Sequence, residues 1–117
     1  MSLEVRMDHY RGVLVVRLAG ELDHHTADEV RRKMEAAIMR ETCSHVILNL
    51  KDLVFMDSSG IGVILGRYKQ ITAKGGKMAV CDASPAVHRL LEMSGLFKII
   101  AVHDSERTAL TSLEVVS

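Results

Sequence analysis

The stretch VILNLKDLVFMDSSGIGVILGRYKQITA, residues 46–73, decides the fold of this chain. Its first five residues, 46–50, are nearly all apolar, which predicts a strand buried on both faces of a sheet. From residue 59 to residue 73, large apolar side chains recur every three or four positions, which predicts a helix. These side chains are Ile61, Ile64, Leu65, Tyr68 and Ile71. A buried strand that leads into a helix is the repeating unit of an α/β protein.

The sequence on both sides continues this alternation. The strands expected before the stretch are residues 3–7 and 13–18, and the helix expected is residues 26–42, with Thr26 and Glu29 spaced as a capping box. The elements expected after it are a strand at 77–81, a helix at 84–94 that starts with Ser84 and Pro85, a strand at 99–102 and a helix at 104–116. This order predicts a single α/β domain over residues 1–117. We expect a mixed sheet with an N-terminal antiparallel hairpin and about four helices packed on the sheet.

The charge balance argues against nucleic acid as a partner. Fifteen Lys and Arg residues balance fifteen Asp and Glu residues, so the formal net charge is zero. Binding to a phosphate backbone favours a basic excess or a basic stripe. The basic run at residues 31–33 is flanked by Glu29 and Glu35, which is typical of a solvated helix face.

Hydropathy and cysteine usage indicate the compartment. No apolar run approaches the ~20 residues of a membrane span, and the first eight residues lack the apolar segment of a secretion signal. Cys43 and Cys81 are far apart in sequence, and we expect both to be buried, reduced thiols. We therefore expect a cytoplasmic protein with no membrane partner.

The sequence patterns of metal, nucleotide and nucleophile sites are absent. The six histidines are scattered, and none has a metal-ligand spacing. Gly60 and Gly62 lack the third glycine of a dinucleotide-binding loop. Ser58 and Ser59 do not lie in the G-x-S-x-G context of a hydrolase nucleophile. We therefore predict no catalytic residue, no metal ion and no cofactor.

A phosphoacceptor with an aspartate nucleophile is a rival enzyme class. Asp52 and Asp57 follow the central strand, as that chemistry would require. The earlier strands, however, end near Asp8 and Gly20 and supply no acidic pair to hold Mg²⁺. A phosphate that is stable in acid and lost in strong base would point to serine instead.

The junction Asp57-Ser58-Ser59-Gly60 between the central strand and its helix allows two interpretations. The first is helix capping, in which a serine hydroxyl accepts a bond from an unpaired backbone N–H and the helix dipole favours Asp57. The second is a phosphorylation site, because a helix N-terminus presents N–H groups and partial positive charge to a phosphate. Phosphate on Ser58 would add about −1.5 to −2 charges beside Asp57. Such a surface could bind a partner when unmodified and repel it when modified.

Two motifs lie in register along the chain: GELD at residues 20–23, after a strand, and LVFMDSSGIG at residues 53–62. In both, the chain resembles the STAS family, the sulfate-transporter and anti-sigma factor antagonist domains. The continuation VILGRYK at residues 63–69 is similar, more narrowly, to the antagonists that act on the anti-sigma factor of sigma F in spore-forming bacilli. The resemblance covers nearly the whole chain, including residues 77–81 and 94–96.

The resemblance implies roles for particular residues. In such antagonists the first serine of the DSSG motif accepts a phosphate, and this serine is Ser58 here. Ser59 is expected to be the N-cap of the helix, and Asp57 to cap the helix or shape the electrostatics of the site. Asp23 is expected to contact the partner or to position the Ser58 hydroxyl. The rest of the contact surface is expected to be Ser59, Gly60, Ile61, Glu21 and Arg67, with a solvated helix charge as an equal alternative for Arg67.

The resemblance also implies partners. The unphosphorylated protein is expected to bind an anti-sigma factor and so release sigma factor F. The anti-sigma factor is also a serine kinase, whose own ATP and Mg²⁺ serve to phosphorylate Ser58, and a serine phosphatase reverses the modification. This chain is thus expected to be a substrate and a binder, without a cofactor, and a monomer when free. The alternative within the family is a scaffold or a ligand-binding module in another signalling pathway.

Overall fold

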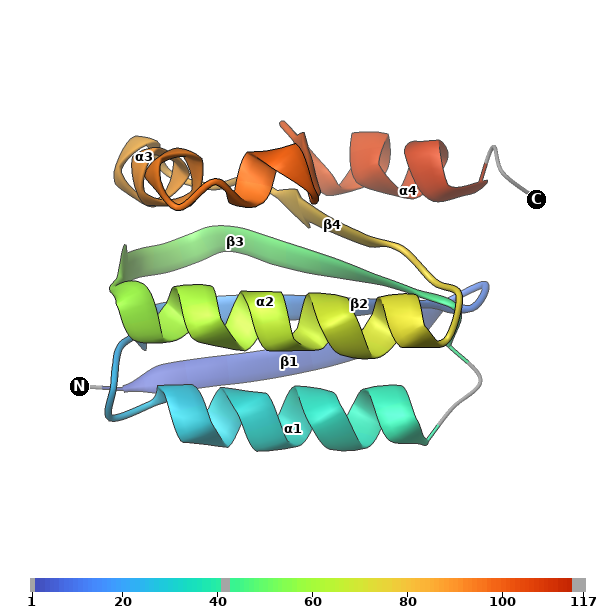
Figure 1. The fold of residues 1–117 in the computed structure, drawn as a ribbon, viewed down its shortest axis with the longest axis horizontal. Helices are drawn as coiled ribbons and strands as arrows, with labels where there is room; N and C mark the ends of the chain where they lie inside the picture. Colours follow the sequence, from blue (N-terminus) through green and yellow to red (C-terminus); the bar gives the residue numbers. More distant parts are fainter. Residues whose placement is uncertain (1, 41–42, 115–117) are drawn as a thin grey trace.

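Five strands form one sheet in the computed structural model, which describes residues 2–40 and 43–114 (Figure 1). They are β1 (Leu3–Tyr10), β2 (Val13–Leu22), β3 (His45–Met56), β4 (Met78–Cys81) and β5 (Ala101–His103), and they lie in this order across the sheet. β1 and β2 are antiparallel, whereas the neighbours from β2 to β5 are parallel. Arg11 and Gly12, with φ values of 50° and 83°, make the tight turn of the hairpin. The structure confirms the predicted mixed sheet with its N-terminal hairpin.

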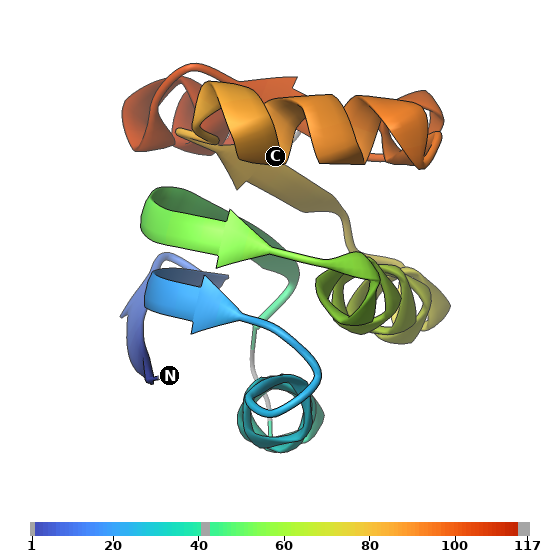
Figure 2. The ribbon, with the colours of Figure 1, turned by 90° about the vertical axis from the view of Figure 1, so that its left-hand side faces the viewer.

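The described residues also form four α-helices and a short 3₁₀ helix. They are α1 (Ala27–Met39), α2 (Ser58–Ala73), α3 (Pro85–Met93), η1 (Leu96–Lys98) and α4 (Glu106–Glu114). Of these helices, α1, α2 and α3 pack on one face of the sheet and α4 packs on the other (Figure 2). No helix in the described part of the chain combines the length and the apolar character needed to cross a bilayer.

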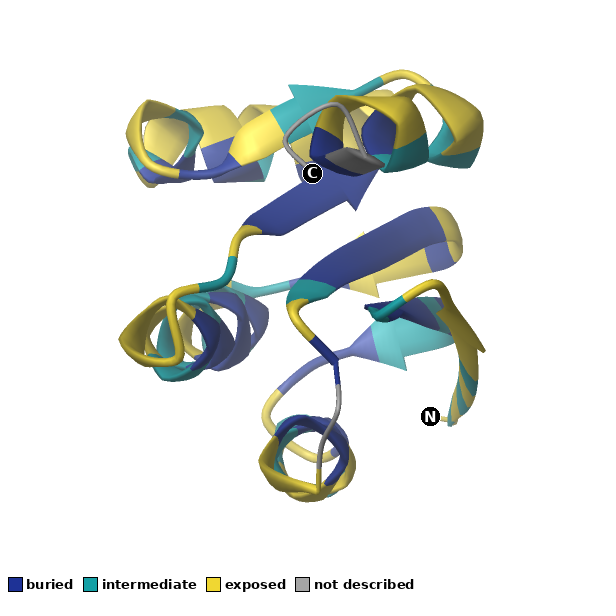
Figure 3. Ribbon diagram, turned by 90° about the vertical axis from the view of Figure 1, so that its right-hand side faces the viewer, coloured by how far each residue is buried: buried dark blue, intermediate teal, exposed yellow. Residues whose placement is uncertain are grey.

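The core lies on both faces of the sheet, and aliphatic side chains dominate it. The larger cluster joins β2, β3 and β4 to α1, α2 and α3, and its fully buried members include Leu14, Leu48, Met34 and Ile64. A smaller cluster under α4 includes Ile47, Cys81 and Ala109. Figure 3 shows the buried stripes of the helices turned toward the sheet. Both cysteines are buried as predicted, and burial, helped by the nearby Asp82, strongly raises the pKa of the Cys81 thiol.

Several elements end at residues other than those predicted. β2 continues to Leu22 and β3 to Met56, because the two strands pair in parallel until Leu22 lies opposite Met56. The pairing register shifts twice along the way. GELD therefore lies mostly inside β2 and does not follow it. The last strand starts at Ala101 instead of residue 99, since η1 and the turn after it occupy the preceding residues. The predicted helix residues 41, 42, 115 and 116 lie outside the described residues.

The predicted capping box of α1 is wrong, whereas the predicted start of α3 is confirmed. Thr26 is the N-cap residue of α1, but its side chain makes no capping bond. Its hydroxyl instead donates to the Glu21 carbonyl oxygen at 2.8 Å and accepts from the Asp23 N–H at 3.0 Å. At α3, the Ser84 side chain accepts from the Val87 N–H at 3.3 Å, and Pro85 is the first helical residue.

Candidate functional site

The carboxyl ends of β2 and β3 bring the two sequence motifs together. The strands are parallel and Leu22 lies opposite Met56, so both chains leave the sheet at the same edge. The Asp57 N–H donates to the Leu22 carbonyl oxygen at 3.2 Å, which ties the start of the β3–α2 junction to the end of β2. Figure 2 looks onto this edge, where α1 and α2 both begin. Exposed groups in α/β proteins commonly gather at such an edge.

Asp57 caps α2 with its own carboxylate. Asp57 has an extended backbone, and its Oδ1 accepts from the Ser59 N–H at 2.8 Å. Ser58 and Ser59 are therefore the first two helical residues, and the prediction that Ser59 is the N-cap is wrong. The carboxylate takes this place because its charge also stabilises the positive end of the helix dipole.

Ser58 stands exposed at the amino end of α2, whereas Ser59 is half-buried. No hydrogen bond to another described residue holds the Ser58 hydroxyl. A hydroxyl in this place is accessible to a second protein. A phosphate added to it would lie against the N-terminus of the helix, where N–H groups and the helix dipole favour negative charge.

Asp23 organises the loop between β2 and α1. Its residue exposure is 6%, and its Oδ1 accepts from the backbone N–H groups of His25 at 2.8 Å and Thr26 at 3.1 Å. Burial favours a raised pKa for Asp23, but these hydrogen bonds outweigh it and hold the pKa below the usual value. Among the described residues, no hydrogen bond joins Asp23 to Ser58. The structure therefore gives Asp23 a role in shaping the loop that follows β2, and its expected contact with a partner stays a prediction.

Glu21, Gly60 and Ile61 complete the group at this edge. Glu21 lies in β2 opposite Phe55, and its Oε1 is buried without a hydrogen-bond partner in the described part of the chain. Gly60 is buried, and there is no room for a side chain, since a Cβ at this position would lie 2.4 Å from the Met56 Cγ. Ile61 is half-buried and packs against the larger core cluster. Glu21 and Ile61 are both half-buried, so each keeps part of its surface accessible.

Arg67 does not have the solvated position that was one of its two predicted roles. It is 8% exposed, because α1 packs against α2 over this residue. Its Nε donates to the Gln70 Oε1 at 3.0 Å, and its Nη2 lies 3.6 Å from the Glu35 Oε2. Burial lowers the pKa of Arg67, only partly countered by Glu35, and the Arg31 charge lowers it further. Sequence spacing missed this burial because it depends on how closely α1 approaches α2.

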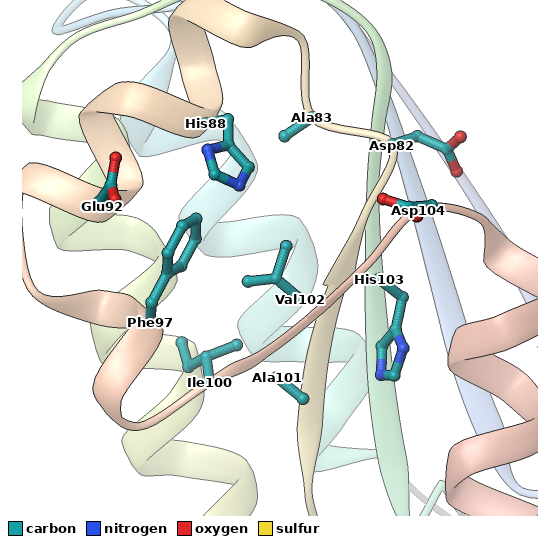
Figure 4. Close-up of a pocket in the computed structure, with 10 residues that line it drawn as sticks. All are labelled: Asp82, Ala83, His88, Glu92, Phe97, Ile100, Ala101, Val102, His103 and Asp104. Atoms are coloured by element: carbon teal, nitrogen blue, oxygen red, sulfur yellow. The ribbon is translucent and has the colours of Figure 1, made fainter.

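A separate cavity of about 420 Å³ lies at the carboxyl ends of β4 and β5 (Figure 4). Its lining combines carboxylates, imidazoles and apolar groups, among them Asp82, Asp104, His88 and Phe97, and includes none of the residues predicted for the site. The His88 and Phe97 rings meet edge to face, with centroids 4.6 Å apart. Within residues 2–40 and 43–114, no group of three His, Cys, Asp or Glu residues is placed to hold a metal ion.

Comparison with known proteins gives the family. The sequence model of the STAS domain matches residues 4–109. The chain belongs to the STAS family. This STAS domain is 66% identical to the anti-sigma F factor antagonist of Paenibacillus polymyxa over 117 residues, which is the full length of both proteins.

Solved structures extend the similarity to the three-dimensional fold. The anti-sigma factor antagonist SpoIIAA in its unphosphorylated form is 32% identical, with a TM-score of 0.85, and the match covers 97% of this STAS domain and 99% of that chain. The Bacillus cell fate determinant SpoIIAA in its phosphorylated form is 33% identical, with a TM-score of 0.75, over 93% and 98% of the two chains. The predicted family and fold are confirmed.

Proposed function

We propose that this STAS domain is an anti-sigma factor antagonist that acts on the anti-sigma factor of sigma F and is switched off by phosphorylation of Ser58. One observation carries the proposal: the exposed Ser58 is the first residue of the helix that Asp57 caps. The chain in which it stands is 66% identical to an anti-sigma F factor antagonist over its full length. Ser59 is less accessible, and its N–H is held by the Asp57 carboxylate.

The proposed switch requires little movement of the chain. The anti-sigma factor, acting as a kinase, transfers the γ-phosphoryl group of ATP to the Ser58 Oγ. An O–P bond forms at Ser58, the bond from the γ-phosphorus to the bridging oxygen breaks, ADP leaves, and a base of the kinase takes the hydroxyl proton. The helix N-terminus accommodates the new dianion. The dianion also stands beside Asp57 on the partner-binding surface, where repulsion and desolvation weaken the complex.

The unphosphorylated form is proposed to bind the anti-sigma factor and so release sigma factor F. A serine phosphatase hydrolyses the phosphoserine and restores this form. ATP and Mg²⁺ are bound by the kinase, so this chain acts as substrate and binder, not as an enzyme, and needs no cofactor of its own. The proposed location of the cycle is the cytoplasm, with no direct contact to nucleic acid or membrane.

The direct test is incubation of the purified protein with its cognate sporulation anti-sigma factor and Mg²⁺-ATP, followed by mass spectrometry of its peptides. Phosphate is expected on Ser58 alone. Thr72→Ala, which removes an exposed hydroxyl from the far end of α2, is the matched control and should still be phosphorylated, whereas Ser58→Ala should not. Absence of phosphate on the wild type, with the kinase proven active on another substrate, would refute the proposal.

A further inference from the structure

β5 is an edge strand whose outer side is unpaired. Among the described residues, β4 is the only strand beside it. The Asp82 N–H donates to the His103 carbonyl oxygen at 3.2 Å, so the backbone groups of His103 face β4. Successive residues of a strand turn these groups to opposite sides, so the N–H and C=O of Val102 face away from β4. The described part of the chain supplies no further strand to bind them.

The two edges of the sheet differ in their protection against an added strand. β1 carries the exposed, charged Glu4, Arg6 and Asp8, and charged side chains on an edge strand hinder its pairing with another chain. β5 has no Lys, Arg, Asp or Glu. Its first residue, Ala101, is exposed, and Ile99 just before the strand is 46% exposed. β5 is therefore the edge that is open to an added strand.

Each face of β5 borders a hollow. Val102 pairs with Val80 of the larger core cluster, so its side chain lies on the face that α3 covers, where it lines the cavity of about 420 Å³ (Figure 4). Ala101 pairs with Ala79 of the smaller cluster, so it lies on the face that α4 covers. There it lines a second hollow, of about 450 Å³, with walls from α2 and α4.

The first hollow, which we name the acidic hollow, holds the carboxylates of Asp82, Glu92 and Asp104. The described residues that line it include no Lys or Arg to pair with them. The Phe97 ring forms part of the wall (Figure 4). A basic side chain suits this hollow, because its aliphatic stem can pack on the ring while its charge meets the carboxylates.

The second hollow, which we name the apolar hollow, is lined by Tyr68 of α2, Leu113 of α4 and the exposed Ile99, among others. Lys77 is the only Lys, Arg, Asp or Glu among the described residues that line it. An apolar side chain suits this hollow, whereas a basic one would be repelled by Lys77. The two hollows thus select different side chains on the two faces of β5.

We infer that β5 binds an extended segment of another protein as an added strand, and that basic and apolar side chains alternate along this segment. The residue opposite Val102 shares its face, so its basic side chain enters the acidic hollow. The residues on either side of it point to the other face, toward the apolar hollow. Backbone hydrogen bonds to Val102 supply affinity, and the hollows supply specificity. None of the residues predicted for the Ser58 site lines either hollow, so this surface is independent of the proposed function.

The first test is an NMR titration of the isotope-labelled protein with a synthetic peptide of about seven residues in which lysine and valine alternate. The largest amide shifts are expected at residues 101–103, and the Kd should rise with salt, because the lysines face carboxylates. A control peptide with glutamate in place of lysine should bind at least about tenfold more weakly. Equal binding of the two peptides, or shifts confined to other surfaces, would overturn the inference.

Val102→Pro tests the strand edge itself. Proline lacks the N–H that faces away from β4, and it is tolerated where the N–H side of an edge strand faces solvent. The variant should keep the wild-type amide spectrum outside β5 and should bind the lysine–valine peptide at least about fivefold more weakly, which corresponds to one lost backbone hydrogen bond. Unchanged binding by the folded variant would mean that the peptide does not pair with β5.

Asp104→Asn tests the acidic hollow, with Asp52→Asn as the matched control. Both aspartates are exposed, but Asp52 lies in β3 and lines neither hollow. Asp104→Asn should raise the Kd about twofold to threefold and reduce its salt dependence, whereas Asp52→Asn should change neither. Equal effects of the two changes would refute the role of the hollow. If Val102→Pro does not fold, this pair decides the question by the same titration.

A second copy of this chain is the competing occupant of the edge. Without peptide, the wild type should sediment as a monomer in sedimentation velocity. If it forms a dimer that an excess of the lysine–valine peptide dissociates, β5 joins two copies of this chain and the inference is overturned.

Discussion

Two neighbouring serines at the start of α2 have different surroundings because an aspartate precedes them. Asp57 supplies the capping carboxylate and fixes the Ser59 N–H, so neither serine side chain is needed to start the helix. The Ser58 hydroxyl is therefore left available for another protein. At this scale, the sequence left capping and phosphorylation as alternatives for the same residues. The structure gives the capping to Asp57 and leaves the Ser58 side chain exposed.

Substitutions of Ser58 test the charge-based switch. Ser58→Ala should bind the anti-sigma factor as the wild type does and should not dissociate when ATP is added. Ser58→Asp should bind more weakly, by up to several kcal/mol, because it places a carboxylate where the phosphate would stand. Isothermal titration calorimetry with the purified kinase measures both affinities. Normal binding by Ser58→Asp would count against the electrostatic account.

At the scale of single elements, α2 offers a paired comparison of two glycines. Gly60→Ala should destabilise the protein by about 1–3 kcal/mol, since the new methyl group would overlap Met56 and approach Leu22. Gly62→Ala should stabilise it by about 0.5–1 kcal/mol, since the helix improves and the methyl group meets open space. Urea denaturation monitored by circular dichroism gives both values. Equal effects of the two changes would contradict the packing described for α2.

The start of β3 makes stability depend on pH. The Lys77 N–H donates to the His45 Nδ1 at 3.0 Å, which requires that nitrogen to be unprotonated. Burial, together with the Lys77 charge, lowers the pKa of His45 below its ordinary value of 6.5. The unfolded chain therefore takes up the proton more readily than the folded chain. The stability contributed by His45 is complete above pH 6.5 and is lost as the pH falls from 6.5 through the folded-state pKa.

The measurement is the free energy of unfolding between pH 7.5 and pH 5, compared with that of His45→Asn. The asparagine carbonyl oxygen can accept the Lys77 N–H and does not titrate in this range. The wild type should lose more stability than the variant as the pH falls. Parallel pH profiles for the two proteins would remove His45 as the cause.

The ends of β2 and β3 show which parts of an element can be predicted from sequence. The apolar run of residues 46–50 identified the strand, but its extension to Met56 includes the exposed Lys51 and Asp52 and carries no clear alternation. That extension exists because β2 runs beside it, so it depends on pairing between distant residues. Arg67 is similar, because the helical spacing placed it on α2 correctly but could not show that α1 covers it.

At the scale of the whole molecule, the element order determined the architecture. Alternating strands and helices favour parallel neighbours with helices on the faces of the sheet, and the structure has this form from β2 to β5. The meeting of the GELD and DSSG segments follows from the same topology, because neighbouring parallel strands end at one edge. The packing of α1 against α2 could not be predicted, since it depends on how the helices cross.

The assembly state in solution would distinguish a switch from a scaffold. The radius of gyration of the Cα atoms is 12.8 Å, close to the roughly 13 Å expected for one domain of this length. We expect the free protein to elute from gel filtration as a monomer at micromolar concentration. Elution as a large particle would favour the scaffold alternative over the antagonist.

The two ends of the described chain lie at opposite ends of the molecule (Figure 1). Ser2 is held against the carboxyl end of β2, since its carbonyl oxygen accepts from the Glu21 N–H at 3.1 Å. A purification tag or fluorophore fused before Ser2 would thus stand beside Ser58 and obstruct partners, giving a false negative in a pull-down. Attachment after α4 would leave that edge clear, and immobilised protein for binding assays is best anchored there.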